Sequence, residues 1–237
     1  MTVRLTSLSI FMPAYNEESN IAATIIDAAK AAKSITSDYE IIVVNDGSDD
    51  KTADIVQALA KQNEHLRLIN HRQNRGYGAA VKTGLAACRK DWIFFTDSDG
   101  QFHYDELGRF AEATSVADLV MGYRRKRMDP FHRVFVAQVL RKIWNFVLFG
   151  LTVRDVDCAY KLFRRLVRDT VKLKTESAIT VSEFIIKAKV ANFRIKQLPV
   201  SHYPRRFGQQ TGGNWRVIAK AARESFRLYR ELHTPKL

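Results

Sequence analysis

The stretch Trp92-Ile93-Phe94-Phe95-Thr96-Asp97-Ser98-Asp99-Gly100-Gln101 changes from apolar to acidic within a few residues. Its apolar start predicts a short buried strand over 92–95. Ligands of open α/β sheets bind beyond the carboxyl ends of the strands, and two carboxylates at such an end suit a divalent cation such as Mg²⁺ or Mn²⁺. A plain Asp-Ser-Asp-Gly turn explains the same residues equally well. The rest of the chain therefore has to decide between the two interpretations.

The first half of the chain alternates strands and helices. Further strands are predicted at Ser7–Met12, Tyr39–Val44, Leu66–Asn70 and Leu119–Gly122, and helices at Ser19–Ser34, Ser48–Gln62 and Gly78–Cys88. Ser48 is the expected N-cap of its helix, with Asp49 and Asp50 in the first turn. This alternation predicts a mainly parallel sheet that helices cover on both faces.

The second half has a different pattern. It predicts helices at Arg133–Phe149, Val181–Lys189 and Trp215–Leu232, and a strand at Asn192–Val200. The last helix is basic and amphipathic, with Arg and Lys on the faces that its apolar residues leave free. No repeat or low-complexity linker divides the chain. One domain over residues 1–210 is expected, followed by the basic helix in residues 211–237.

Composition narrows the class of protein. The chain has 237 residues, of which 46% are hydrophobic, so it can bury a full core. Its net charge of +13 predicts a polyanionic partner, such as nucleic acid, an anionic membrane or a phosphorylated substrate. Cys88 and Cys158 lack metal-binding or redox spacing, so free thiols are expected. No signal peptide and no transmembrane helix are expected, because the apolar runs are too short.

Two other strand ends carry groups that suit a nucleotide. Pro13-Ala14-Tyr15-Asn16-Glu17 follows the first strand, where Tyr15 can contact a base and Glu17 can accept a ribose hydroxyl. The alternative is an ordinary turn that leads into a helix. Asp46 ends the second strand and can accept a hydrogen bond from a base or a ribose, which discriminates strongly against groups that cannot donate.

The glycine-containing segment Asn74–Lys82 matches neither the dinucleotide fingerprint nor the P-loop, because its glycine spacing is wrong for both. A helix start remains, with exposed backbone N–H groups and Lys82 nearby. Such a start suits phosphate or a sugar diphosphate. Close packing of small residues is an equally good explanation.

Four motifs occur in one order along the chain. They are Pro13-x-Tyr15-Asn16-Glu17, Asn45-Asp46-Gly47-Ser48, Asn74-x-Gly76-x-Gly78-Ala79 and Asp97-Ser98-Asp99-Gly100-Gln101. Together they resemble the family-two inverting glycosyltransferases, over about residues 7–210. Gly122-Tyr123-Arg124, Asp155–Arg165 and Leu198-Pro199-Val200 are similar to the polyprenyl-phosphate sugar synthase branch, typified by dolichol-phosphate mannose synthase. The resemblance implies an α/β, GT-A type nucleotide-diphospho-sugar transferase fold with a mainly parallel central sheet flanked by helices.

The resemblance also implies roles for single residues, in a donor half (about 1–122) and an acceptor half (123–210). Nucleoside binding falls to Pro13, Tyr15, Glu17 and Asp46, and metal and diphosphate binding to Asp97, Asp99 and Gln101. Arg124 and Arg133 would grip an acceptor phosphate, Asp155 would be the candidate base, and Arg205 would close over the diphosphate. The chain departs from the family pattern at Asp157, at Ala159 and at Gly208–Gly213.

The expected function is metal-dependent, inverting transfer from a UDP- or GDP-sugar to a polyprenyl phosphate, by a peripheral protein at the cytoplasmic face of an anionic membrane. A soluble glycosyltransferase with a saccharide or other hydroxyl acceptor is the nearest alternative, and Asp155 or Asp157 would then act as a base. A nucleic-acid-binding module is disfavoured, because carboxylates at three strand ends would repel phosphates and no recognition motif is present. A nucleotidyltransferase would need a glycine-rich, basic first loop, which this chain lacks.

Overall fold

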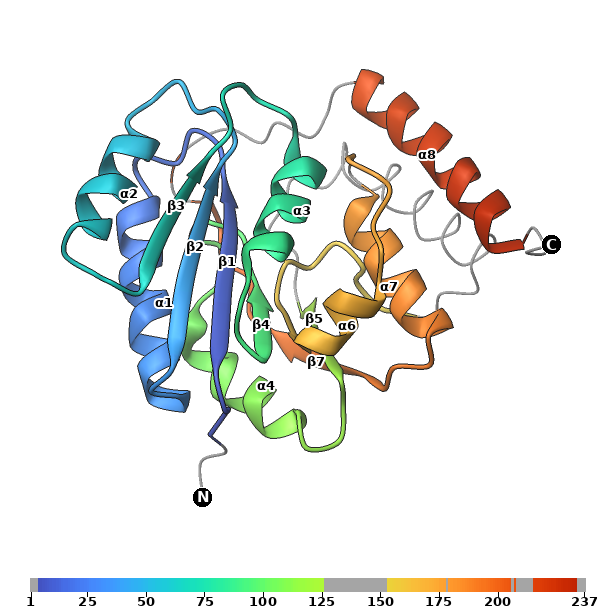
Figure 1. Cartoon of the computed structure of the whole chain (residues 1–237), viewed down its shortest axis with the longest axis horizontal. Coiled ribbons are helices and arrows are strands. Elements are labelled where there is room, and N and C mark those ends of the chain that lie inside the picture. Colours follow the sequence, from blue (N-terminus) through green and yellow to red (C-terminus); the bar gives the residue numbers. More distant parts are fainter. Residues whose placement is uncertain (1–3, 126–152, 178, 206, 208–214, 234–237) are drawn as a thin grey trace.

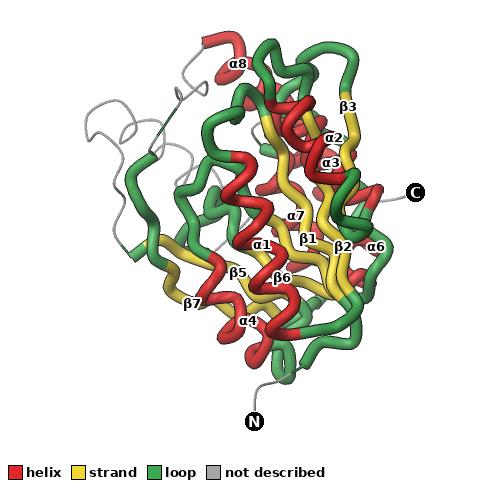
Figure 2. The backbone as a smooth tube through the Cα atoms, turned by 90° about the vertical axis from the view of Figure 1, so that its left-hand side faces the viewer, coloured by secondary structure: helices red, strands yellow, loops and turns green. Residues whose placement is uncertain are grey.

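A central sheet with helices on both faces forms the framework of the protein. The computed structural model describes residues 4–125, 153–177, 179–205, 207 and 215–233. Seven strands make one sheet in the order β3-β2-β1-β4-β6-β5-β7. Helices α1, α2 and α4 cover one face, and α3, α6, α7 and α8 lie on the other (Figure 1). Figure 2 shows α1 and α4 in front of the strands from the side.

The strands are β1 (Leu8–Ala14), β2 (Tyr39–Asn45), β3 (Leu66–Asn70), β4 (Trp92–Phe95), β5 (Leu119–Arg124), β6 (Lys161–Arg164) and β7 (Ile195–Val200). The helices are α1 (Ile21–Ile35), α2 (Thr52–Ala60), α3 (Tyr77–Ala87), α4 (Leu107–Ala113), α6 (Arg165–Thr170), α7 (Thr180–Val190) and α8 (Trp215–His233), with a 3₁₀ helix η1 at Tyr104–Glu106. Within the described residues, no helix is long and apolar enough to cross a membrane.

The predicted parallel sheet is confirmed for the first four strands. β1 pairs in parallel with both β2 and β4, and β2 pairs in parallel with β3. The register aligns Ala14 with Asn45 and Asn45 with Asn70, so β1, β2 and β3 end at the same level. β4 ends slightly earlier, opposite Phe11. The loops that carry the predicted site residues therefore leave one edge of the sheet together.

Strand β6 was not predicted, and it is the exception to the parallel order. It runs antiparallel to both β4 and β5 and lies between them. Four residues that begin with a lysine give no apolar run or alternation long enough to indicate a strand. Helices α4 and α6 were also missed, because each is short. The predicted helix Arg133–Phe149 lies outside the described residues.

The expected N-cap at Ser48 is wrong. α2 begins at Thr52, four residues later. The Ser48 hydroxyl instead accepts a hydrogen bond from the Asn16 N–H, at 3.0 Å. The Asp50 carboxylate accepts the Thr52 N–H at 2.9 Å. Ser48 is therefore used to join the β1–α1 and β2–α2 loops, a tertiary contact that local sequence does not reveal.

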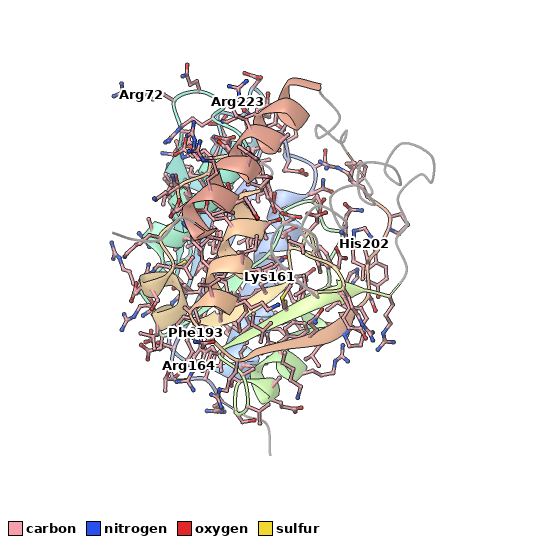
Figure 3. The ribbon with its side chains drawn as sticks, turned by 90° about the vertical axis from the view of Figure 1, so that its right-hand side faces the viewer. Arg72, Lys161, Arg164, Phe193, His202 and Arg223 are labelled. Atoms are coloured by element: carbon pink, nitrogen blue, oxygen red, sulfur yellow. The ribbon has the colours of Figure 1, made fainter. Side chains whose placement is uncertain are left out.

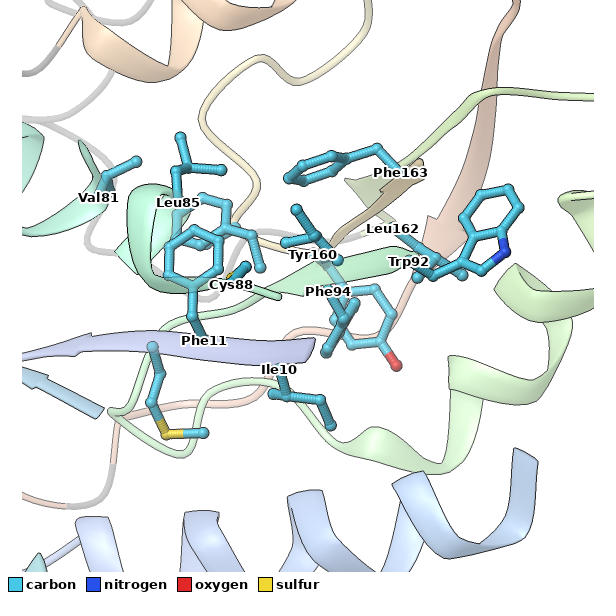
Figure 4. Packing of buried hydrophobic residues seen from close by; sticks show 14 of the residues in the cluster. Ile10, Phe11, Val81, Leu85, Cys88, Trp92, Phe94, Tyr160, Leu162 and Phe163 are labelled. Atoms are coloured by element: carbon cyan, nitrogen blue, oxygen red, sulfur yellow. The ribbon is translucent and has the colours of Figure 1, made fainter. Parts of the chain in front are cut away.

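Aromatic rings fill the core between the sheet and its helices (Figure 4). Phe11 and Phe95 stack at 4.9 Å between ring centroids, and Phe94 meets Tyr160 edge-on at 4.7 Å. These contacts join β1, β4 and the segment before β6. The cysteines are free and buried, as expected. Burial raises the pKa of both thiols to about 12.

A buried carboxylate organises the loop before α7. Glu183 is 0% exposed. Its oxygens accept the N–H groups of Lys174 and Thr175, both at 2.9 Å, and the Lys187 ammonium at 2.6 Å. These bonds satisfy an otherwise costly buried charge. They hold the loop over residues 172–177 against α7, where the loop also meets the start of α3.

We expect Glu183→Gln to lower the free energy of unfolding by about 3 kcal/mol, because the amide presents N–H groups to backbone donors and leaves Lys187 without its buried partner. Urea unfolding measures this change. Glu231→Gln is the matched control: Glu231 also pairs with Lys187, at 3.5 Å, but its side chain is 31% exposed. Its loss is expected to cost less than about 1 kcal/mol. Equal losses in the two variants would contradict this role of Glu183.

Candidate active site

Asp97 and Asp99 lie just beyond β4, at the common edge of the sheet. Both are half-buried. The Tyr77 hydroxyl, from the start of α3, donates to Asp97 Oδ1 at 2.9 Å. Burial and the neighbouring Asp99 charge raise the pKa of Asp97 to about 7, although Tyr77, Lys161 and Arg124 oppose this shift. Negative charge is therefore concentrated here and only partly balanced by the protein.

This carboxylate pair fits a divalent cation whose remaining ligands come from elsewhere. No group of three or more His, Cys, Asp or Glu residues within the described part of the chain is placed to hold a metal by itself. Mg²⁺ typically binds through one or two carboxylates together with substrate phosphates and water. Two neighbouring carboxylates at the edge of a nucleotide-type sheet match that mode, so Asp97 and Asp99 are the residues that would hold the ion.

Gln101, the third predicted metal residue, holds the chain beyond β7. Its side-chain amide donates to the Tyr203 carbonyl at 3.0 Å, and the Tyr203 N–H donates to the Gln101 carbonyl at 2.9 Å. The Gln101 N–H also donates to Asp99 Oδ1, at 3.0 Å. These bonds place residues 201–205 beside the carboxylates. Metal binding by Gln101 stays a prediction.

The structure brings Arg205, Glu17 and Asp99 together from distant parts of the chain. The Arg205 guanidinium donates to Glu17 Oε1, and its Nη1 lies 3.8 Å from Asp99 Oδ2. Glu17 is 6% exposed and also accepts from the Asn20 amide at 2.7 Å. Burial raises the pKa of Glu17, and the Asn20 and Arg205 contacts reduce this rise. The segment after β7 therefore closes against the loop after β1.

The loop after β1 is held by its neighbours. The Pro13 carbonyl accepts the Ser98 hydroxyl at 2.8 Å, which ties this loop to the acidic loop after β4. The Tyr15 hydroxyl lies 3.5 Å from Asp49 Oδ2 of the next loop. The predicted nucleoside residues Pro13, at the end of β1, and Tyr15 and Glu17, in the loop that follows, thus lie beside the carboxylates. Their contact with a base or a ribose stays a prediction.

Asp46 organises the loop between β3 and α3. Its carboxylate accepts the N–H groups of Arg75 at 3.0 Å and Gly76 at 2.8 Å, and it lies 2.6 Å from His71 Nδ1. Gly47, at φ +69°, allows the same loop to approach, because a Cβ there would lie 2.5 Å from the Asn74 nitrogen. The predicted contact of Asp46 with a nucleoside must therefore coexist with these bonds. His71 was missed, because a single histidine after a strand gives no specific signal.

Lys82 and Gly78 of α3 contact the loop before α7 and the first residue of α7. The Lys82 ammonium donates to Glu176 Oε1 at 3.0 Å, and the hydrogen bond from Lys82 is the main cause that lowers the pKa of Glu176. A Cβ on Gly78 would lie 2.4 Å from Thr180 Oγ1. Close packing therefore accounts for the small residue at position 78. Diphosphate binding by Lys82 stays a prediction.

A buried ion pair marks the acceptor side. Arg124 Nε donates to Asp155 Oδ2 at 2.7 Å, and Arg124 Nη2 donates to Asp155 Oδ1 at 3.0 Å. The two side chains are 11% and 8% exposed. Burial disfavours the charge of Arg124, but the Asp155 carboxylate raises the pKa of the guanidinium on balance. Both Asp155 oxygens are thus engaged. Arg133 lies outside the described residues.

Besides His71, two further polar residues of the site had no role predicted from the sequence. Tyr77 contacts Asp97, as described above, and Lys161 is buried at the start of β6. Lys161 belongs to the motif Asp155–Arg165, which gave it no role of its own. Only the tertiary structure brings its ammonium close enough for its charge to lower the pKa of Asp97. Arg124 affects Asp97 in the same direction. The carboxylates predicted for the donor half and the cations predicted for the acceptor half therefore influence each other electrostatically.

Comparison with known proteins agrees with this arrangement. The family model of glycosyl transferase family 2 matches residues 9–170. A dolichyl-phosphate beta-glucosyltransferase from Dictyostelium discoideum is 32% identical over 178 residues, which are 67% of this chain and 54% of that protein. The chain thus spans about half the length of this curated relative. The predicted resemblance to the dolichol-phosphate sugar synthase branch is confirmed by this similarity.

Solved structures confirm the predicted GT-A type fold. Glucosyl-3-phosphoglycerate synthase from Mycobacterium tuberculosis, solved with Mn²⁺, UDP and phosphoglyceric acid, aligns with a TM-score of 0.71 and 18% identity, over 97% of this chain and 80% of that one. Mannosyl-3-phosphoglycerate synthase from Rubrobacter xylanophilus aligns with a TM-score of 0.72 and 18% identity, over 98% of this chain and 77% of that one. From its sequence motifs, its fold and the family match together, the chain belongs to glycosyl transferase family 2.

Proposed function

We propose that this protein transfers a sugar, with inversion, from a nucleotide-diphosphate sugar to a polyprenyl phosphate. The observation that carries the proposal is the sheet register, in which Lys161 of β6 pairs with Phe95 on one side and Met121 on the other. The chain leading to Asp97 and the strand that ends at Arg124, the buried partner of Asp155, therefore flank β6. An arginine at such a position suits a phosphate acceptor. The similarity to a dolichyl-phosphate beta-glucosyltransferase supports the same acceptor class.

On the donor side, the loop with Pro13, Tyr15 and Glu17 would bind the nucleoside, together with Asp46. Asp97 and Asp99 would hold Mg²⁺ or Mn²⁺, with Gln101 beside them. When bound, such an ion supplies positive charge that stabilises the departing nucleoside diphosphate. Arg205 and Lys82 are the protein's own cations for that diphosphate. Arg205 would then exchange its contact with Glu17 for a contact with the donor.

The proposed reaction is a single displacement at the anomeric carbon. An acceptor phosphate oxygen forms the new bond to this carbon, and the bond to the diphosphate oxygen breaks and leaves its electron pair on the nucleoside diphosphate. The transition state resembles an oxocarbenium ion, as in glycoside hydrolysis. A phosphate is already anionic at neutral pH, so Arg124 has to orient the nucleophile and no strong base has to deprotonate it. Both Asp155 oxygens accept hydrogen bonds from Arg124, which suits a carboxylate that orients the arginine and does not act as a base.

A lipid acceptor requires access to a membrane, and α8 offers a surface for it. Its exposed side chains include Lys220, Arg223, Phe226 and Arg227, and Phe226 is 56% exposed. Basic residues around an aromatic ring suit a surface of anionic lipids. We propose that this face of α8 attaches the protein peripherally to the cytoplasmic face of such a membrane. The sequence also suggests Trp144, Phe149 and Trp215 as interfacial aromatics, but their side chains lie outside what the structure describes.

Thermal shifts with nucleotides test the donor site. We expect the melting temperature to rise with UDP or GDP in the presence of Mn²⁺, and to rise less with either component alone, because the ion links the carboxylates to the diphosphate. Asp99→Asn should remove the metal-dependent part. Asp91→Asn, at the exposed opposite end of β4, is the matched control and should keep it. The absence of a metal-dependent shift with every nucleoside diphosphate would refute the donor site.

Asp155→Asn tests the acceptor chemistry. We expect this variant to retain measurable transfer to a polyprenyl phosphate, with a loss below about a hundredfold, because a phosphate nucleophile needs no general base. Transfer assays with radiolabelled donor measure the loss, and Asp157→Asn serves as the comparison. Complete loss of transfer with intact donor binding would instead assign Asp155 the role of a base and favour a hydroxyl acceptor.

Vesicle co-sedimentation tests the role of α8. We expect binding to anionic vesicles at low salt that weakens as salt increases, because the attraction is electrostatic. Arg223→Glu together with Arg227→Glu should abolish binding. The control variant carries Lys30→Glu and Lys33→Glu at exposed positions of α1. It changes the net charge by the same amount and should have little effect on vesicle binding. Equal losses in the two double variants would show that only total charge matters and would contradict a specific surface on α8.

A further inference from the structure

Lys161 occupies a junction between the two halves of the site. It begins β6, which lies between β4 and β5, and it is 1% exposed. In the register of the sheet it pairs with Phe95 on one side and Met121 on the other. Beyond Phe95 the chain continues to Asp97, and beyond Met121 it continues to Arg124. Figure 3 shows Lys161 in the interior, behind the helices on this side of the sheet.

The ammonium of Lys161 binds the turn that precedes its own strand. Its Nζ donates to the Val156 carbonyl at 3.1 Å and also to the Cys158 carbonyl. It lies 5.8 Å from the centroid of the Phe95 ring. Both carbonyls belong to the segment over residues 155–160, which we call the acceptor turn. This turn carries Asp155, the partner of Arg124, and also Asp157.

A lysine at this position costs stability. Burial lowers the pKa of Lys161, while the charges of Cys158, Asp155, Asp157 and Asp97 oppose this shift. A methionine of similar length would fill the same space without burying a charge. Residues that cost stability are typical of functional sites, where another requirement outweighs stability. The contacts of Lys161 suggest that this requirement is the placement of the acceptor turn.

We propose that Lys161 is a positioning residue that holds the acceptor turn, and with it the pair of Arg124 and Asp155, in place relative to Asp97 and Asp99. This inference rests on the proposed function, since it concerns where the acceptor phosphate lies relative to the donor sugar. Loss of the ammonium frees two carbonyls of the turn and lets the acceptor shift. Small misplacements of a nucleophile cost large factors in rate. Donor binding does not use the acceptor turn, so an effect of the missing Lys161 charge on Asp97 would reach donor hydrolysis and transfer alike.

Lys161→Met separates this role from a purely structural one. The donor is the UDP- or GDP-sugar that the wild-type protein hydrolyses with Mn²⁺, and the acceptor is an isoprenoid monophosphate in detergent. We expect transfer to fall by about a hundredfold. Hydrolysis of the donor by water should fall far less than transfer, since water needs no acceptor turn, whereas any loss through the missing charge near Asp97 would reduce both reactions alike. The urea midpoint should stay close to the wild-type value, because the gain from not burying an ammonium offsets the loss of the donor to the two carbonyls.

Lys161→Arg is the conservative partner variant. It keeps a cation and the N–H donors for the carbonyls but adds volume to a buried position, so its urea midpoint should fall. It should nevertheless transfer more sugar than Lys161→Met. The proposal therefore predicts opposite orders of the two variants in stability and in transfer. If transfer simply follows the urea midpoint across the variants, Lys161 is structural and the proposal is overturned.

The remaining outcomes also decide the question. Three results would overturn the positioning role and leave the proposed function intact. They are transfer by Lys161→Met at the wild-type rate, an equal loss of hydrolysis and transfer in this variant, and failure of this variant to fold. A wild-type protein that hydrolyses the donor but transfers nothing to the isoprenoid monophosphate would refute the phosphate acceptor and this inference together. A wild-type protein with neither reaction would refute the proposed function itself.

Discussion

The repulsion between Asp97 and Asp99 is the constraint to which the rest of the site responds. Two carboxylates leave β4 two residues apart, and burial together with their mutual charge raises the pKa of Asp97 to about 7. The protein reduces this strain from several directions: Tyr77 donates a hydrogen bond, Arg205 lies beside Asp99, and the charges of Lys161 and Arg124 act on Asp97. None of these contacts neutralises the pair as closely as a bound cation would, and that remaining negative charge suits a metal-bound diphosphate.

The same loops serve two purposes, and this explains why several predicted binding residues already have partners in the protein. Asp46 holds the loop between β3 and α3, Gln101 holds the chain after β7, and Glu17 receives Arg205. Such contacts fix the positions of binding groups before a ligand arrives, which limits the entropy lost on binding. Arg205 differs from Asp46 and Gln101. In the proposed function, its ionic contact with Glu17 has to weaken before its guanidinium can reach a diphosphate.

The acceptor side depends on a strand that reverses the sheet direction. Because β6 runs antiparallel between β4 and β5, its first residue pairs with Phe95 at the end of β4 and with Met121 of β5, three residues before Arg124. Lys161 therefore lies where the donor-side and acceptor-side loops begin, and Arg124 and Asp155 form their buried pair next to it. A wholly parallel sheet would place the start of this strand at the opposite edge. The antiparallel insertion is what joins the two halves into one site.

Sequence by itself determined the parallel half of the fold and the family. The runs at 8–14, 39–45 and 92–95 are largely apolar because these strands are buried along their whole length, and polar motifs stand at the strand ends. The tertiary structure alone decided the rest. Ser48 was mistaken for a helix cap because its partner Asn16 is distant in sequence. β6 was missed because four residues carry too short a pattern. Tyr77, His71 and Lys161 became site residues only through contacts that the folded sheet creates between distant segments.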